Sequence, residues 1–184
     1  LVIVDDQSID DSFQIASFYA KLDPRIRVFR NRQNLGDYSN RNEAIRLARF
    51  EYLKFLDADD TLLPSALEVY QRAVLSTWEI SPSYYFVVMN GELTSVRFKA
   101  LTSERAYRRY YVERRRTFDA APTSCLYRRS ILHEDGVFEP LPQLGDFELA
   151  HRLSLTRPSV MIETPKPLAN WRMHPKQQSM KIRQ

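Results

Sequence analysis

Cysteine, glycine and long apolar runs are scarce in this sequence of 184 residues. It contains one cysteine, Cys125, and four glycines. A single cysteine excludes an internal disulfide framework and a cysteine-rich zinc site, so we expect a reducing, cytoplasmic setting. No run approaches the roughly 18 apolar residues that cross a bilayer, which excludes an integral membrane protein. The hydrophobic share of 43% instead predicts an ordinary globular core.

Charge of either sign is not in large excess. The 27 lysines and arginines against 23 acidic residues give a formal charge of +4, which suits an anionic small molecule, a lipid surface or nucleic acid about equally. The length predicts one domain over residues 1–184, because two smaller cores would be hard to stabilise. The chain begins at once inside an apolar strand, "LVIVDD", without an initiator methionine, so we expect a fragment or a chain whose preceding residues are missing.

Apolar periodicity in the first 76 residues alternates between strand and helix. Strands are predicted at residues 1–5, 26–30 and 52–57, and helices after Asp10, over 41–50 and from Pro64 to about Ser76. Such alternation predicts an α/β fold with a parallel, doubly wound sheet. In the second half the pattern predicts strands at 84–89, 93–98, 159–163 and 167–173, and a helix from Asp146.

Two acidic clusters follow predicted strands of the first half. They consist of Asp5 with Asp6, and of Asp57, Asp59 and Asp60. Ligands of open α/β sheets bind beyond the carboxyl ends of the strands, so both clusters are expected to line one crevice. Crowded carboxylates favour a divalent cation, and oxygen ligands suit Mg²⁺ or Mn²⁺. The alternative is that Asp10 and Asp60 cap helices and that the others are solvated.

The neighbours of these clusters carry a resemblance to a known family. "VIVDDQSIDDS", followed by "NLGDYSNRNEAIRLARFEYLKFLDADD", resembles the inverting nucleotide-sugar glycosyltransferases of family two, which have the GT-A fold. The second half matches more loosely, through "LGDFELAHRLS" and "WRMHPKQQSM". The resemblance implies a Rossmann-like, mostly parallel sheet flanked by helices, and we expect the family's first strand to be missing here. It also implies a nucleotide-binding half (1–76) and an acceptor-binding half (77–184).

By this resemblance the chain transfers a sugar from a UDP- or GDP-sugar to a saccharide or lipid-linked acceptor, with inversion, in cell-surface polysaccharide or glycan synthesis. The donor would be bound by a set of five residues: Asp5, Asp6, Arg41, Asp57 and Asp59. A Mg²⁺ or Mn²⁺ ion would be held by Asp59, Asp60 and His174, and would stabilise the departing diphosphate as a Lewis acid.

The resemblance assigns the general base to Asp146, at the start of the predicted helix "GDFELAHRLS". The residue before it is Gly145, where the family commonly has Glu. Asp146 could instead be a helix N-cap, with Phe147, Ala150 and Leu153 as the buried face. Arg41 at a helix start could also be merely solvated, and a lone histidine such as His174 is often structural.

The segment "RAYRRYYVERRR" (105–116) concentrates six arginines and three tyrosines. It could cover the diphosphate, meet a phosphate-bearing lipid acceptor or rest on the inner face of an anionic membrane, or it could be a solvated helix face.

Two other functions compete with the transferase. "FLDADDTLL" also resembles the first motif of haloacid-dehalogenase-type phosphatases, with Asp57 as nucleophile and Mg²⁺ as cofactor. That family usually carries its nucleophile on the first strand, which disfavours this alternative. A nonenzymatic, basic nucleic-acid-binding domain does not account for five strand-end aspartates, which repel phosphate. We therefore expect no nucleic acid partner.

Overall fold

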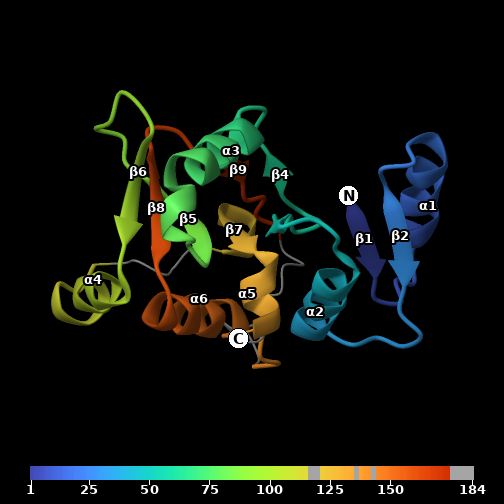
Figure 1. The fold of residues 1–184 in the computed structure, drawn as a ribbon. Coiled ribbons are helices and arrows are strands. Elements are labelled where there is room, and N and C mark those ends of the chain that lie inside the picture. Colours follow the sequence, from blue (N-terminus) through green and yellow to red (C-terminus); the bar gives the residue numbers. More distant parts are fainter. Residues whose placement is uncertain (116–120, 135–136, 142–143, 175–184) are drawn as a thin grey trace.

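The computed structural model describes residues 1–115, 121–134, 137–141 and 144–174. The first part contains seven helices and strands: β1 (Val2–Asp5), α1 (Ser12–Leu22), β2 (Arg27–Arg30), α2 (Asp37–Leu47), β3 (Tyr52–Leu53), β4 (Thr61–Leu62) and α3 (Ala66–Thr77). The alternation of strand and helix that apolar periodicity predicts is confirmed (Figure 1). Of the helices within the described ranges, none combines the length and the hydropathy that a membrane-spanning helix requires.

The second part adds shorter helices and the remaining strands. They are η1 (Trp78–Ile80), β5 (Tyr84–Met89), β6 (Arg97–Leu101), α4 (Ser103–Tyr107), the π-helical turn η2 (Arg108–Val112), η3 (Pro122–Ser124), β7 (Cys125–Arg128), α5 (Arg129–Glu134), α6 (Gly145–Thr156), β8 (Ser159–Thr164) and β9 (Ala169–Asn170). The helix expected from Asp146 therefore begins one residue earlier, at Gly145.

The central sheet has five strands in the order β3-β7-β5-β8-β6. Only β5 and β8 pair in parallel, whereas β3–β7, β5–β7 and β6–β8 are antiparallel. The sheet is thus mixed, and the expectation of a mostly parallel sheet was wrong in this respect. The reason is that β6 follows β5 without a crossover helix, so that the chain turns back, whereas β8 follows helix α6 and can run parallel to β5.

Strand β3 is also shorter than the predicted strand over residues 52–57. After Leu53, backbone groups form hydrogen bonds with side chains instead of with another strand. The Phe55 carbonyl accepts a hydrogen bond from Lys54 Nζ, and Asp57 N–H donates to Thr123 Oγ1 at 3.3 Å. Lys54 Nζ also donates to the Thr123 carbonyl. These bonds release the chain from the sheet before it reaches the aspartates. Asp57, Asp59 and Asp60 consequently lie in a turn, closed by Asp60 N–H donating to the Asp57 carbonyl at 3.0 Å.

Side chains alternate between the two faces of the central sheet, as strand geometry requires. On one face Tyr84, Phe86, Tyr127 and Met161 pack with α2, α5 and α6. On the other face Tyr85, Leu126, Val160 and Ile162 pack against α3. The sheet therefore lies between two helical layers. The four strand residues named for each face are all buried.

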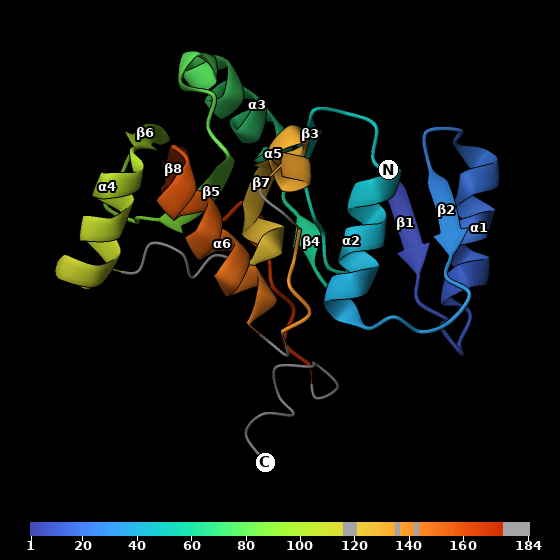
Figure 2. The same cartoon turned by 60° about the horizontal axis from the view of Figure 1, so that its bottom comes forward.

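Strands β1 and β2 form a separate parallel pair, and β4 pairs with β9. Figures 1 and 2 both place α2 between the β1–β2 pair and the central sheet. Ile45 of α2 belongs to the buried core. Asn40 of the same helix contacts β1, because its Nδ2 donates a hydrogen bond to the Val4 carbonyl at 3.2 Å. Helix α2 thus connects the first two strands to the body of the protein.

Candidate active site

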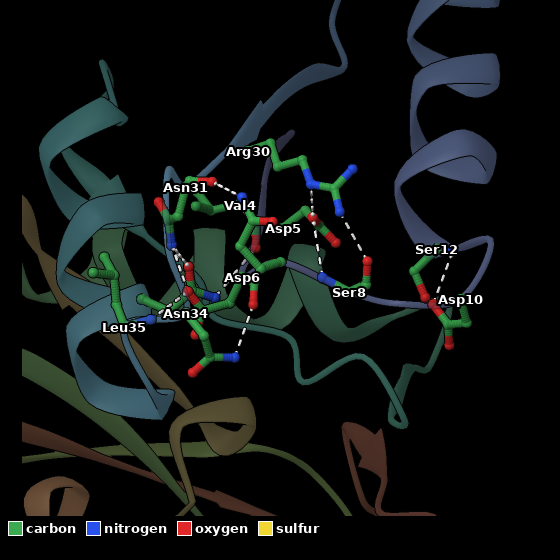
Figure 3. Close-up of polar contacts among 12 residues, drawn as sticks. Val4, Asp5, Asp6, Ser8, Asp10, Ser12, Arg30, Asn31, Asn34 and Leu35 are labelled. Carbon is green, nitrogen blue, oxygen red and sulfur yellow. Dashed lines mark hydrogen bonds and ion pairs between the residues drawn. The ribbon is translucent and has the colours of Figure 1, made fainter.

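Asp6, which follows β1, holds the loop that precedes α2. Its Oδ1 accepts hydrogen bonds from Leu35 N–H and Asn31 Nδ2, and its Oδ2 accepts one from Gly36 N–H, each at 2.8 Å (Figure 3). Gly36 has φ 82°, a conformation that a side chain would disfavour, and α2 begins at the next residue. The hydrogen bond from Gly36 N–H to Asp6 Oδ2 fixes the chain directly before Asp37, where α2 begins. The sequence predicts the start of this helix at residue 41 instead. Asp6 shapes the loop expected to meet the donor.

Asp5 is buried and pairs with a strand residue. Its Oδ2 lies 3.0 Å from Arg30 Nε on β2 and accepts a 3.3 Å hydrogen bond from Ser8 N–H. Arg30 also donates to the Ser8 carbonyl at 2.9 Å, so these residues fix the turn after β1 (Figure 3). The contacts of Asp5 point to a supporting role behind Asp6.

Arg41 on α2 links the loop that Asp6 holds with the second acidic cluster. Its Nε lies 2.8 Å from Asp37 Oδ1, and its Nη1 lies 2.7 Å from Asp57 Oδ1. Burial alone would lower the pKa of Arg41, but the charges and hydrogen bonds of Asp57 and Asp37 outweigh burial and raise it. Arg41 is therefore a fixed, charged bridge and not a solvated helix start. Because the Asp57 carboxylate is paired with Arg41, it is poorly placed to act as the nucleophile that the phosphatase alternative requires.

The C-terminal segment reaches the same turn. His174 Nε2 lies 3.1 Å from Asp59 Oδ2, although 115 residues separate the two in the sequence. Asp60 is buried, and its Oδ1 accepts a 3.2 Å hydrogen bond from Arg172 N–H, while Arg172 Nε donates to the Asp59 carbonyl. The pairing of β9 with β4 places this segment there. Residues 175–180 of the motif "WRMHPKQQSM" lie outside the described residues.

The predicted metal ligands Asp59, Asp60 and His174 do not come together as a group of three. Across the described parts of the chain, no group of three histidine, cysteine or acidic side chains is close enough to hold an ion by itself. Asp59 and His174 offer one carboxylate and one imidazole, with about a third to two fifths of each side chain exposed. Mg²⁺ commonly takes one or two protein ligands and completes its shell with phosphate oxygens and water. The donor set therefore fits an ion that binds together with a diphosphate.

Asp146 lies in the first turn of α6 and contacts α2. Its Oδ1 accepts hydrogen bonds from Phe147 N–H at 2.9 Å and from Tyr38 O–H at 3.2 Å. The N-cap of α6 is Leu144, so Asp146 is not a helix cap. The buried face of α6 includes Ala150 and Leu153 as expected, but Leu149 replaces the half-buried Phe147. Tyr38 and Arg41 share α2, which therefore contacts both the candidate base and the second acidic cluster.

Lys54 and Tyr38 were not identified from the sequence. Burial lowers the pKa of Lys54 to about 8, and the charges of Asp57 and Asp60 offset only part of this effect. The sequence signal was a lysine inside an otherwise apolar strand pattern, "YLKFL". Tyr38 gave no such signal, because its partner is 108 residues away.

Comparison with known proteins gives a consistent result. The sequence model of the family described as Glycosyl transferase family 2 matches residues 1–136. A glycosyltransferase of Methanocaldococcus jannaschii, MJ1057, is 31% identical over 96 residues, which cover 50% of this chain and 33% of that protein. The cholesterol galactosyltransferase of Borreliella burgdorferi is 32% identical over 88 residues, 47% of this chain and 24% of that protein. The chain thus spans a third or less of the length of these relatives.

Solved structures show the same fold. S. aureus TarS 1–349 in complex with UDP-GlcNAc superposes with a TM-score of 0.71 at 19% identity, covering 98% of this chain and 51% of TarS 1–349. The mannosyltransferase PcManGT of Pyrobaculum calidifontis, in complex with GDP-Man and Mn²⁺, gives a TM-score of 0.62 at 16% identity, covering 90% and 47% of the two chains. This likeness confirms the α/β fold of the GT-A type.

Proposed function

Because this chain belongs to glycosyl transferase family 2, we propose that it transfers a sugar from a nucleoside diphosphate sugar to an acceptor hydroxyl, with inversion at the sugar. The observation that carries the proposal is the contact of Asp59 with His174, which joins the aspartate turn to the C-terminal segment. Arg41 holds Asp57 beside them. Polar and charged groups of three distant segments thus converge where a diphosphate and its counter-ion are expected.

The donor's diphosphate binds at this turn. Asp59 and His174 would hold a Mn²⁺ or Mg²⁺ ion, and the buried Asp60 supports them by fixing the backbone at Arg172. A bound ion would supply Lewis-acid stabilisation of the leaving diphosphate. Asp6 positions the loop around the nucleoside, and Asp5 supports the turn that carries Asp6. The Arg41–Asp57 pair lies on the ribose side of the donor site. A UDP- or GDP-sugar suits this site, as in the complexes of TarS and PcManGT.

Asp146 accepts the proton of the acceptor hydroxyl as it attacks the anomeric carbon. A general base of this kind contributes about 10²- to 10⁴-fold to the rate. The acceptor approaches beside α6, where a hollow of about 540 Å³ is lined by aromatic and polar groups, including Tyr110, Phe147 and His151. A saccharide or lipid-linked acceptor in surface polysaccharide or glycan synthesis fits this position.

The donor site is tested by thermal unfolding of the full chain with UDP or GDP, each with and without Mn²⁺. Stabilisation by a nucleotide that requires Mn²⁺ and is lost in Asp59→Ala supports the proposal. Asp10→Ala, which removes an exposed aspartate away from the site, should retain the stabilisation. If no nucleotide stabilises the parent, and p-nitrophenyl phosphate is hydrolysed by the parent but not by Asp57→Asn, the chain is a phosphatase instead.

The base is tested separately. Asp146→Asn should bind UDP and Mn²⁺ as the parent does but lose sugar transfer by about a hundredfold or more. Transfer at the parent rate in this variant would remove Asp146 from the mechanism.

We also propose that the enzyme works at the cytoplasmic face of an anionic membrane. Tyr107, Tyr111 and Val112 expose apolar surface beside the exposed Arg105 and Arg108, which is the composition of a membrane-contacting surface. Arg116 of this motif lies outside the described residues. The lone Cys125 is buried, in keeping with a reducing compartment.

Flotation with vesicles tests this contact. The full chain should float with vesicles containing phosphatidylglycerol and not with pure phosphatidylcholine, and the double variant Arg105→Ser/Arg108→Ser should float less. The matched variant Arg49→Ser/Arg72→Ser removes the same charge from exposed positions elsewhere. Equal loss in both double variants would indicate a general charge effect and contradict a specific surface.

A further inference from the structure

The Asp146 carboxylate is held from a distant part of the chain. Tyr38 O–H, on the first turn of α2, donates to Asp146 Oδ1 at 3.2 Å, and Phe147 N–H donates to the same oxygen at 2.9 Å. Both described hydrogen bonds therefore fall on Oδ1. This arrangement leaves Oδ2 as the oxygen that receives a proton from an acceptor.

The Tyr38 ring is fixed by close packing. It stacks on Phe138, with ring centroids 5.7 Å apart and an interplanar angle of 22°. It also lies directly over Gly145: a Cβ at this position would be 2.9 Å from two ring carbons of Tyr38 and 2.7 Å from the Glu139 carbonyl oxygen. Any larger residue before Asp146 would displace the ring. The glycine and the tyrosine are thus complementary in shape.

Helix α2 also fixes the segment that carries Phe138. Asn42, one turn after Tyr38, donates from Nδ2 to the Phe138 carbonyl at 2.8 Å, and its Oδ1 accepts from Phe138 N–H at 3.0 Å. The ring and its stacking partner are consequently anchored to the same helix. A tyrosine held in this way has little freedom to leave Asp146.

We propose that Tyr38 is a positioning residue for Asp146: its hydroxyl fixes Oδ1 by a hydrogen bond, so that Oδ2 faces the acceptor. The inference rests on the proposed function of Asp146 as the base. Gly145 provides the space that Tyr38 needs. This pair places a phenol hydroxyl next to the candidate base, from the helix that also carries Arg41.

Three titratable groups that interact with Asp146, namely Tyr38, Cys125 and Tyr127, stay neutral near pH 7. Burial and the charge of Asp146 raise the pKa of Tyr38. On β7, burial raises the pKa of Tyr127 well above its usual value and that of Cys125 to about 12. Near pH 7, a change at the Asp146 carboxyl on losing the phenol is therefore attributable to the lost hydrogen bond and not to a change in the charge of these three groups.

The test is Tyr38→Phe in the full chain, with Tyr19→Phe on the exposed face of α1 as the control. Carbon-13 NMR of the Asp146 side-chain carboxyl near pH 7, assigned by its absence from Asp146→Asn, reports the hydrogen bonding of this group without any substrate. Tyr38→Phe should shift the resonance, because a hydrogen-bond donor to Oδ1 is lost. Tyr19→Phe should leave the resonance unchanged. An unmoved resonance in Tyr38→Phe overturns the inference.

Kinetics separate this inference from the proposed function. With UDP-GlcNAc as probe donor and water as acceptor, Tyr38→Phe should lower kcat by about tenfold with KM for the donor within about twofold of the parent. Full retention of kcat in Tyr38→Phe, when Asp146→Asn is inactive, overturns the positioning role. If Asp146→Asn also keeps the parent rate, the proposed base is wrong, and the carboxyl resonance still decides whether Tyr38 holds Asp146.

Discussion

Arg41 Nη1 lies 2.7 Å from Asp57 Oδ1 and joins helix α2 to the turn that follows β3. Both side chains are largely shielded from water, with 18% and 28% of their surfaces exposed. A pair in this position holds two elements together, and it also sets the charge at the edge of the candidate donor site.

Replacement of Arg41 by methionine should therefore reduce both stability and donor binding. Loss of the guanidinium leaves Asp57 and Asp37 without their cation, and we expect a loss of about 1 to 3 kcal/mol in the free energy of unfolding by urea. The matched control is Arg25→Met, which breaks the exposed pair with Asp23 and should leave the unfolding midpoint unchanged. Equal effects of the two substitutions would show that the Arg41 bridge is no stronger than a surface pair.

Asn42→Ala should destabilise the contact between α2 and the segment before α6. The substitution removes both hydrogen bonds to the Phe138 backbone and leaves partly buried groups without a partner. We expect a cost of about 2 kcal/mol in urea unfolding. Asn90→Ala, which removes an exposed local bond to Glu92 N–H, is the control and should cost much less. A cost below that of Asn90→Ala would contradict this account.

Gly145→Ala should destabilise the protein through overpacking. The new methyl group would meet the Glu139 carbonyl oxygen at 2.7 Å and the Tyr38 ring at 2.9 Å, and we expect a cost of about 1 to 3 kcal/mol. Gly91→Ala adds the same methyl group at a position with nothing within 4 Å, so its thermal midpoint should stay close to that of the parent. Similar losses in both variants would exclude the close approach of Tyr38 as the cause.

Lys54 should make stability depend on pH in the alkaline range. The pKa of Lys54 is about 8 in the folded chain and near its ordinary value of 10.5 in the unfolded chain. Between these values the unfolded state binds more protons, so the free energy of unfolding rises with pH, and the contribution is lost as the pH falls toward 8.

Comparison with Lys54→Met isolates this contribution. The stability of the parent relative to the variant should increase by about 2 kcal/mol between pH 8 and 10.5. Urea unfolding of both proteins at several pH values measures the difference. If the free energies of unfolding of the two proteins change with pH in parallel, burial does not lower the pKa of Lys54.

Sequence patterns predict the local elements well and the long-range contacts poorly. The strand at 84–89 and the helix start near Asp146 follow directly from apolar periodicity. The early end of β3 does not, because it depends on Thr123, a residue 69 positions beyond Lys54. The order and direction of the strands in the second half are equally nonlocal, and the sequence therefore predicts more parallel pairing than is present.

The residues of the candidate site were also partly predictable from the sequence, whereas their contacts were not. The acidic residues could be selected because carboxylates after apolar strands are unusual, and His174 could be selected through a motif. The roles of Asp5 and Asp6 in holding a loop depend on Arg30, Asn31 and the backbone at Leu35 and Gly36, which only the folded chain brings together. Tyr38 is the extreme case, since its partner lies 108 residues away.

The attachment of the β1–α1–β2 unit through α2 has a consequence for local unfolding. Of the described residues before Tyr38, none belongs to either buried core cluster, and polar bonds such as Arg27 Nη1 to the Leu47 carbonyl, at 3.0 Å, connect the unit to α2. A unit that buries so little apolar surface opens at a lower free energy than the body. Amide hydrogens of β1 and β2 should therefore exchange with solvent faster than those of β5 and β8. A nucleotide that contacts both Asp6 and Asp57 would slow this exchange, which makes local opening a direct measure of donor occupancy.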